Sequence, residues 1–169
     1  MLFRSTEIQK QHLETVNQSA STLLDVVNDI LDISKIEAGK LIIDKEKTSL
    51  RTIINQCIDM MKFMAHQKNL ELIVNIHTDV HCTIWVDEMR LKQILQNLLN
   101  NAIKFTQNGQ IELEVSSTNI NDSSSKIKFS VKDTGIGIKK GNKKKILEAF
   151  TQEDNSTTRN YGGTGLGLT

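Results

Sequence analysis

The sequence predicts an α+β protein in which a long N-terminal helix precedes a mixed α/β domain. Apolar residues recur at helical spacing from residue 5 to about residue 38, which indicates one long amphipathic helix. Two shorter helical patterns, at about 50–68 and 91–106, are interspersed with segments in which apolar and polar residues alternate as in strands. We therefore expect a helical arm over residues 1–39 and a second domain over residues 40–169.

Composition and charge restrict the class of protein. The chain has 169 residues, of which 38% are apolar and 24% charged, and this suits one core of ordinary domain size with an extra arm. A net charge of +1 provides no overall field for nucleic acid, and no apolar run is long enough to span a membrane. We expect neither a nucleic-acid partner nor direct membrane contact. Cys57 and Cys82 lack metal-ligand spacing, so we expect two reduced thiols that are small core residues, with a disulfide as the alternative.

The long helix carries an apolar stripe at heptad spacing. Its members are Leu13, Val16, Ala20, Leu23, Val27, Ile30 and Ser34. Leu24 and Leu31 widen the stripe beyond the seam of a two-stranded coiled coil. One helix cannot bury such a stripe alone, so we expect a partner helix or a second chain. The helix should stop at Ala38-Gly39, before an extended connector, KLIID.

The second domain begins with a helix and two short strands. Ser49 is a candidate N-cap for the helix over 50–68. The residues expected to face inward from this helix are Ile54, Ile58, Met61 and either Met64 or Ala65. LELIVNIH (70–77) and TIWVD (83–87) are predicted strands. Residues 111–117 and 126–133 are predicted to form an antiparallel pair, with INDSSS (120–125) as the hairpin loop.

The helix at 91–106, LKQILQNLLNNAIKFT, combines a wide apolar face with three asparagines. The predicted apolar face consists of Leu91, Ile94, Leu95, Leu98, Leu99 and Ala102, and Asp87 is the candidate N-cap. Asn97 and Asn101 lie four residues apart and share one face, with Lys104 on nearly the same side. Asn100 is expected to lie on the surface. From this helix alone, a solvated polar face and a binding face are both open.

A short glycine motif, DTGIGI (133–138), directly follows a predicted strand. Gly135 and Gly137 allow a sharp turn and let the backbone approach a flat ligand. Asp133 could accept a hydrogen bond from an exocyclic amine such as that of adenine, whereas guanine presents an acceptor there. An ordinary glycine turn is the alternative.

A second glycine-rich stretch, RNYGGTGLGL, covers residues 159–168. Gly162, Gly163, Gly165 and Gly167 expose backbone N–H groups in a pattern suited to phosphate oxygens. Arg159 adds a planar donor fork nearby. A flexible linker is the alternative, but Leu166 and Leu168 look like the start of a helix. The spacing matches neither a P-loop nor a Rossmann fingerprint.

Together these motifs resemble the ATP-binding region of the sensor histidine kinases of two-component signalling, including the hybrid type. QNLLNNAIKFT resembles the N box of that family, DTGIGI its first glycine box and GGTGLGL its second. EAFTQEDNSTTRNYGG resembles the F box and the mobile lid, although Leu147 stands where phenylalanine is usual. NDILDISKIEAGKL resembles the end of the dimerisation helix and its link to the kinase domain. The resemblance runs from about residue 7 to residue 168.

The resemblance implies a fold, two cofactors and a set of site residues. The fold would be an α/β sandwich of the Bergerat ATP-binding type with a mixed, mainly antiparallel sheet. ATP and Mg²⁺ would be the cofactors, with Asn101 as the metal ligand and with Asn97 and Lys104 as catalytic residues at the phosphates. Asp133 would bind adenine in a pocket shaped by Gly135 and Gly137. The residues expected at the phosphate end are Arg159, Gly163, Thr164, Gly165, Leu166 and Gly167.

The implied reaction is transfer of the ATP γ-phosphoryl group to a histidine, followed by relay to a response regulator receiver domain. The H box of the family contains a proline after its histidine, and this chain has four histidines but no proline. We therefore expect the phosphoacceptor helix to be a separate partner, and His12 to be a surface residue. The resemblance also implies a homodimer through the N-terminal helix and a cytoplasmic location, within a bacterial inner-membrane or cytoplasmic sensor kinase. The family continues past the position of Thr169, so we expect C-terminal elements of the domain to be absent.

Two alternatives remain open at the level of sequence. One is an ATPase clamp of the gyrase B, MutL and Hsp90 kind, which shares the nucleotide pocket. The other is a dimeric module that binds ATP without catalysis. The heptad arm and its KIEAGKL link argue against the clamp.

Overall fold

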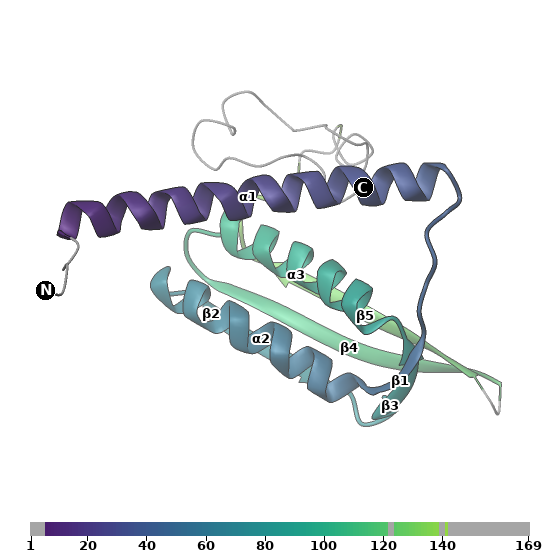
Figure 1. The fold of residues 1–169 in the computed structure, drawn as a ribbon. Helices are drawn as coiled ribbons and strands as arrows, with labels where there is room; N and C mark the ends of the chain where they lie inside the picture. Colours follow the sequence, from purple (N-terminus) through teal and green to yellow (C-terminus); the bar gives the residue numbers. More distant parts are fainter. Residues whose placement is uncertain (1–5, 122–123, 139–140, 142–169) are drawn as a thin grey trace, which may run out of the picture.

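The computed structural model describes residues 6–121, 124–138 and 141. Helix α1 (Glu7–Glu37) runs alongside the second domain and is joined to it by an extended segment (Figure 1). In that domain, α2 (Leu50–Gln67) and α3 (Glu88–Phe105) lie side by side over one face of a sheet (Figure 1). The predicted helical arm, the extended connector and the two shorter helices are confirmed.

Helix α1 is capped at its start and stops at the expected place. The side chain of Thr6 accepts a hydrogen bond from the Gln9 backbone, and the Gln9 side chain accepts one from Thr6 N, which is a capping box. The helix ends before Gly39, whose φ of +63° is a conformation that favours glycine.

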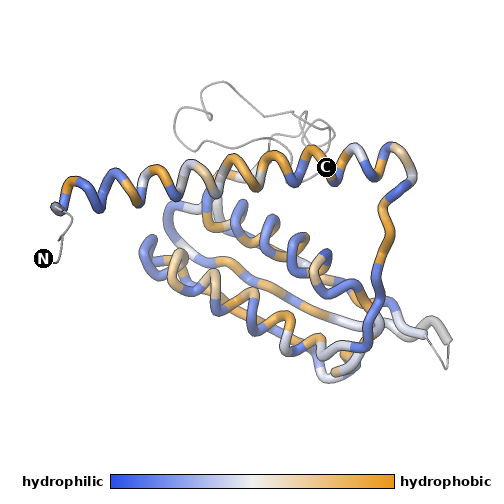
Figure 2. Tube along the Cα trace, viewed as in Figure 1, coloured by the Kyte–Doolittle hydropathy of each residue, from blue (hydrophilic) through white to orange (hydrophobic). Residues whose placement is uncertain are grey.

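The apolar stripe of α1 lies open. Leu13, Val16, Leu23, Leu24, Val27, Ile30 and Leu31 are all exposed, by 42 to 64%. Apolar positions recur along the whole helix in Figure 2. No part of the chain that the structure describes covers this stripe.

The strands form two small sheets. β2 (Glu71–Ile76), β4 (Gln110–Asn121) and β5 (Ser124–Asp133) form the larger one in the order β2-β4-β5. β2 pairs with β4 in parallel, and β4 pairs with β5 antiparallel, as predicted for the latter pair. β1 (Glu46–Ser49) pairs antiparallel with β3 (Thr83–Val86) in a separate ribbon.

Two strand predictions need correction. β1, with the sequence EKTS, was not predicted, because it has no apolar alternation and its strand conformation comes from pairing with β3. The predicted loop at 120–125 is shorter than expected, because β4 continues to Asn121 and β5 starts at Ser124. The β4–β5 ladder reaches these residues with a register shift between Asn119 and Asn121.

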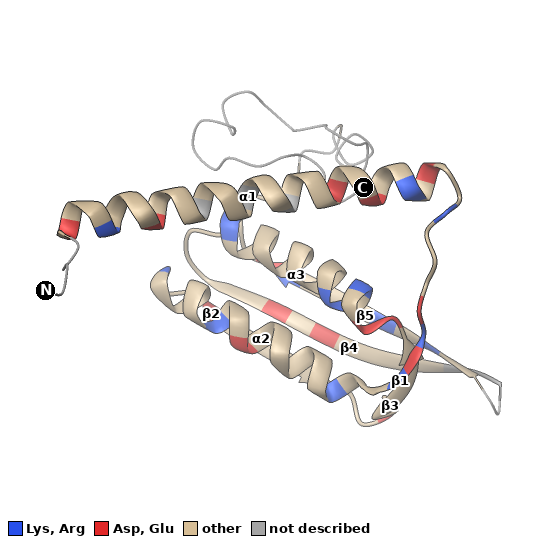
Figure 3. Cartoon of the chain, in the orientation of Figure 1, with Lys and Arg blue, Asp and Glu red and all other residues tan. Residues whose placement is uncertain are grey.

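The core lies between the two helices and the sheet. Ile53 and Ile54 of α2, Leu95 and Leu99 of α3, and Leu113 of β4 are completely buried. Such side chains each contribute about 1.5–3 kcal/mol of burial free energy, so they fix the helices on the sheet. The sheet also carries charged side chains, with Lys132 Nζ 3.0 Å from Glu114 and 3.5 Å from Glu112. Acidic positions along β4 are visible in Figure 3.

The inward faces of the helices differ from prediction at particular positions. Ile94 is 57% exposed, so its predicted place in the buried face of α3 is wrong. The buried stripe instead follows steps of four from Leu91 through Leu95 to Leu99, and Ile94 falls beside it. In α2, Ala65 is buried and Met64 is 42% exposed, which resolves the alternative between them.

The two cysteines and the apolarity of the helices bear on two further predictions. Cys57 is buried as predicted, but Cys82 is exposed, so its predicted place in the core is wrong. Both are free thiols, so the disulfide alternative is wrong as well. Among the helices of the described residues, none has the length and apolarity that a membrane crossing requires.

Candidate functional site

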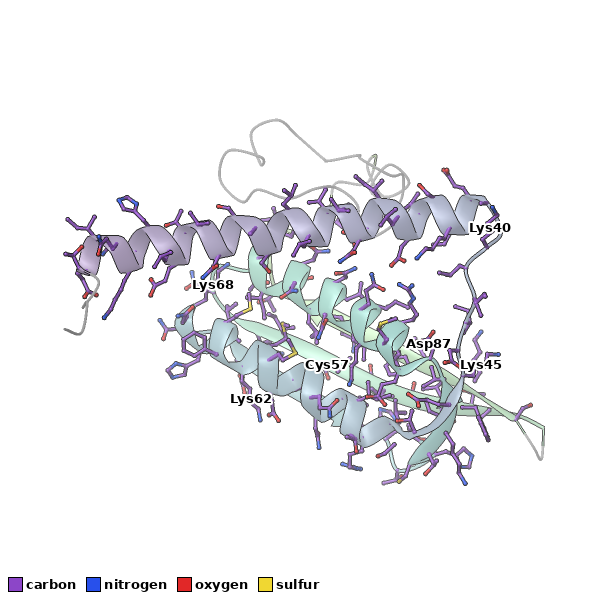
Figure 4. All side chains as sticks on the ribbon, in the orientation of Figure 1. Lys40, Lys45, Cys57, Lys62, Lys68 and Asp87 are labelled. Atoms are coloured by element: carbon purple, nitrogen blue, oxygen red, sulfur yellow. The ribbon has the colours of Figure 1, made fainter. Side chains whose placement is uncertain are left out.

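Helix α3 is fixed at its N-terminus by an aspartate. The Asp87 side chain is 8% exposed and accepts a hydrogen bond from Arg90 N at 3.1 Å, which confirms the predicted N-cap. Its second oxygen accepts from Asp44 N at 3.2 Å. Asp87 therefore also ties the connector after α1 to the start of α3 (Figure 4).

The asparagine face of α3 borders the buried stripe. Asn97, Asn101 and Lys104 are all half-buried, next to the fully buried Leu95 and Leu99. Within the described part of the chain, the side chains of Asn97 and Asn101 have no hydrogen-bond partner. Because Lys104 is partly buried, the pKa of its ammonium is lowered, and its Nζ lies 5.0 Å from the centroid of the Phe105 ring. Three polar groups thus stand together on one flank of α3.

Asn100 is not the surface residue that the sequence predicted. It is half-buried, and its Oδ1 is buried without a hydrogen-bond partner among the residues that the structure describes. Asn100 follows the fully buried Leu99 in the sequence, so its side chain lies at the edge of the packed face of α3.

Asp133 ends β5, as expected, and opens the DTGIGI turn. Its Oδ1 accepts a hydrogen bond from Gly135 N at 2.9 Å, which orients the carboxylate relative to the turn. The residue is exposed, so the carboxylate is open to a ligand. Gly137 has a φ of +67°, which few other residues adopt.

The DTGIGI turn is pressed against the C-terminal end of α3. A Cβ on Gly135 would lie 2.4 Å from the Phe105 carbonyl oxygen, so only glycine fits there. The same oxygen accepts a hydrogen bond from Ile136 N at 3.3 Å. The structure therefore brings the Asp133 turn and the last turns of α3, which carry Asn101 and Lys104, to the same end of the domain.

Thr134 is a residue of this site to which the sequence assigned no role. Its hydroxyl accepts a hydrogen bond from Gln110 N at 3.0 Å, and its own N–H donates to Gln110 O at 3.2 Å. Both bonds hold the turn to the start of β4. Its position inside the glycine motif was the only sequence signal for it.

The second glycine stretch lies outside the described residues. The predicted site residues in this position are Arg159, Gly163, Thr164, Gly165, Leu166 and Gly167, together with the F box and the lid. Two hollows on the described surface, of about 390 and 500 Å³, lie elsewhere, between α2 and α3 and between α1 and α3. Among the described residues, no cluster of three or more His, Cys, Asp or Glu side chains could hold a metal ion alone.

Two family models match the chain. Residues 86–169 match the family described as "Histidine kinase-, DNA gyrase B-, and HSP90-like ATPase". Residues 1–39 match the "His Kinase A (phospho-acceptor) domain". The first match begins just before α3 and includes both glycine motifs, and the second covers the helical arm.

Curated relatives and a solved structure agree with these matches. The "Signal transduction histidine-protein kinase BarA" of Escherichia coli K12 is 42% identical over 163 residues, which are 96% of this chain and 18% of BarA. The "Hybrid signal transduction histidine kinase L" of Dictyostelium discoideum is 44% identical over 160 residues, 95% of this chain and 9% of the relative. The crystal structure of full-length ShkA in complex with AMPPNP superposes with a TM-score of 0.78 at 31% identity, covering 98% of this chain and 33% of ShkA.

The chain therefore spans less than a fifth of each of these two curated relatives, and it aligns with them over nearly its whole length. The family models, the relatives and the fold agree with one another. The chain belongs to the sensor histidine kinases and represents part of their catalytic region.

Proposed function

We propose that this chain binds ATP and transfers its γ-phosphoryl group to a histidine in two-component signal transduction. The observation that carries the proposal is the contact between the DTGIGI turn and the end of α3, through Ile136 N and Phe105 O. This contact brings the Asp133 carboxylate, the Asn101 amide and the Lys104 ammonium to a single end of the domain, and the Asn97 amide lies about one turn earlier on the same face of α3. That set suits a ligand with an amine at one end and phosphates at the other.

The residues of this site would divide the nucleotide between them. The Asp133 carboxylate would accept a hydrogen bond from the adenine amine, with Gly135 and Gly137 allowing the ring to approach. Asn97 and Lys104 would contact the phosphates, together with Arg159 and the residues Gly163, Thr164, Gly165, Leu166 and Gly167. A carboxylate that accepts from a bound amine contributes about 1.5–3 kcal/mol.

Mg²⁺ fits the donor set of α3. Asn101 offers a neutral amide oxygen, and Mg²⁺ commonly combines one or two protein oxygens with phosphate oxygens and water. The lack of a carboxylate cluster among the described residues agrees with such a shared site. When bound, the ion supplies charge neutralisation at the phosphates. The protein's own part is to hold donor and acceptor groups in line.

The phosphoacceptor would be a histidine other than His12. His12 is exposed on α1, and the 169 residues contain no H box, since they contain no proline. We place residues 1–39 in the second helix of the dimerisation region and residues 40–169 in the ATP-binding domain. A phosphoacceptor helix and a response regulator receiver domain would be the partners, in the cytoplasm of the cell.

We also infer a homodimer that forms through α1. The open stripe from Leu13 to Leu31 needs an apolar partner, and a second α1 offers the same surface. The match of residues 1–39 to the phospho-acceptor domain supports this assignment over the ATPase clamp.

The binding proposal is tested by calorimetry with ATP in the presence and absence of Mg²⁺. We expect Asp133→Asn and Asn101→Ala each to weaken affinity by about tenfold or more. Asp59→Asn is the matched control, because Asp59 is an exposed carboxylate of α2 whose ion pair is with Lys62 of the same helix. Unchanged affinity in both site variants would refute the assignment.

The transfer proposal is tested with γ-labelled ATP and Mg²⁺. We expect no histidine label on the chain alone, because positioning dominates this reaction and His12 stands elsewhere. Label should form when a separate helix with an H box is added. Labelling of the unaided chain that disappears in His12→Gln would show that the acceptor is wrongly assigned.

A further inference from the structure

The regular hydrogen-bonding pattern of α3 ends before its last three backbone carbonyl groups. The Ala102 carbonyl accepts the last regular bond, from Thr106 N at 3.1 Å. The carbonyls of Ile103, Lys104 and Phe105 come after it, and their hydrogen-bond donors come from other parts of the chain. This last turn of α3 also carries the side chain of Lys104, the proposed phosphate contact.

The ammonium of Lys68 satisfies two of these three carbonyls. Its Nζ donates to Ile103 O at 2.8 Å and to Lys104 O at 3.1 Å. Lys68 follows the last residue of α2, so the bond joins the ends of the two helices that cover the sheet (Figure 4). A positive charge at this point also offsets the negative end of the α3 dipole.

The turn that presents Lys68 is itself held firmly. Leu70 N donates to Ala65 O at 2.9 Å, and Leu70 is 6% exposed. Between them, Asn69 adopts a φ of +54°, which closes the chain tightly after α2. The backbone of Lys68 is therefore held in a fixed position beside α3, although Lys68 itself is exposed.

The third carbonyl, that of Phe105, accepts from Ile136 N of the DTGIGI turn at 3.3 Å. The last turn of α3 is thus fixed from two sides, by Lys68 and by the glycine turn that carries Asp133. This arrangement sets the spacing between the proposed adenine contact and the asparagine face.

We propose that Lys68 is a positioning residue of the nucleotide site, which holds the last turn of α3 so that Asn101 and Lys104 meet the phosphates in register with Asp133. The inference rests on the proposed function. Lys68 acts through the helix and does not itself touch the nucleotide.

The test uses calorimetry with Mg²⁺ and ATP on Lys68→Met, which keeps the apolar stem and removes the donor. We expect affinity to fall about fivefold, as the loss of a cation at a helix C-terminus implies. Lys68→Arg should restore affinity to within about twofold. Lys62→Met on the same helix is the matched control, since Lys62 pairs only with Asp59 among the described residues, and it should leave affinity unchanged.

A double-mutant cycle separates positioning from a general loss of stability. If Lys68 acts by placing Asn101, the combined variant Lys68→Met/Asn101→Ala should lose clearly less affinity than the product of the two single losses. Hydrogen exchange at residues 101–105 should also be faster in Lys68→Met than in the parent. Independent, multiplying effects would overturn the proposal, and so would an unchanged affinity in Lys68→Met.

The ATP affinity of the Asp133→Asn variant tests the proposed function independently of Lys68. A parent chain that binds ATP, and an Asp133→Asn variant that binds it poorly, uphold the site whatever Lys68 does. If Lys68→Met is too unstable to measure, Lys68→Gln keeps one neutral donor and should show an intermediate loss. Parent-like affinity in Lys68→Gln, together with parent-like exchange at 101–105, would overturn the role of the charge.

Discussion

Arg90 of α3 holds Asp32 of α1 with two nitrogens of its guanidinium group. Nη1 contacts Oδ2 of Asp32, and Nη2 lies 3.0 Å from Oδ1. The two side chains are only 23% and 19% exposed, so the pair is partly shielded from solvent. It joins the helical arm to the helix that carries the asparagine face, next to the N-cap Asp87.

Breaking this pair should loosen the arm. We expect Asp32→Asn to speed amide hydrogen exchange in residues 28–37, because a bidentate pair worth about 1 kcal/mol is lost there. Exchange in residues 91–105 should stay close to that of the parent, since the core beneath α3 is intact. Glu14→Gln, an exposed change on the same helix, serves as the control. Equal exchange of residues 28–37 in the two variants would contradict the role of the pair.

The pair also makes a prediction about pH. The hydrogen bond from Arg90, with a further one from Gln93, lowers the pKa of Asp32 below its ordinary value of 3.8, against the opposing effect of burial. A carboxyl with a depressed pKa in the folded state stabilises that state above its ordinary pKa, and this stabilisation is lost as the pH falls through the folded-state pKa. A carbon-detected titration of Asp32 should therefore have its midpoint below 3.8, and Arg90→Met should raise that midpoint. A midpoint unaffected by Arg90→Met would show that the pair does not form in solution.

Gly135→Ala should disrupt the site through a steric clash of the added Cβ. Its Cβ would lie 2.4 Å from Phe105 O and 2.9 Å from Asp133 Oδ1, so the turn must move away from α3. We expect a loss of about 1–3 kcal/mol in unfolding free energy and weaker ATP binding. Gly39→Ala is the comparison, because its φ of +63° is strained but nothing lies within 4 Å of the added Cβ. That variant should cost about 1–2 kcal/mol and leave ATP affinity as in the parent. Denaturant unfolding and calorimetry measure both effects.

The open stripe of α1 should drive self-association. Leu23 is 64% exposed, and burying a leucine contributes about 1.5–3 kcal/mol in each of two symmetric copies. Leu23→Asp should therefore weaken the dimer by about a hundredfold or more in sedimentation equilibrium. Gln11→Glu, a polar change on the same helix, should have little effect. A parent chain that stays monomeric at high concentration with α1 helical would refute the assignment.

The sequence predicted the helices and their caps because both depend on neighbouring residues. The spacing of apolar residues indicated α1, α2 and α3, and Ser49 and Asp87 cap α2 and α3 as expected. The strand β1 and the parallel pairing of β2 with β4 could not be predicted, since they depend on partners far along the chain. Lys68 was missed for the same reason, because its acceptors are backbone carbonyls 35 and 36 residues away, which no side-chain motif reveals.

The parallel pairing of β2 with β4 has a consequence for the folding kinetics. α3 lies between these strands in the sequence, so its final position is reached only when β2 and β4 close their ladder from Glu71 to Ile76. Such closure is a non-local event whose chain entropy must be lost before its contacts form. The asparagine face of α3 and the DTGIGI turn should then become able to bind nucleotide in the same rate-limiting step, the closure of this ladder. Nucleotide would consequently slow unfolding of the domain without accelerating its refolding.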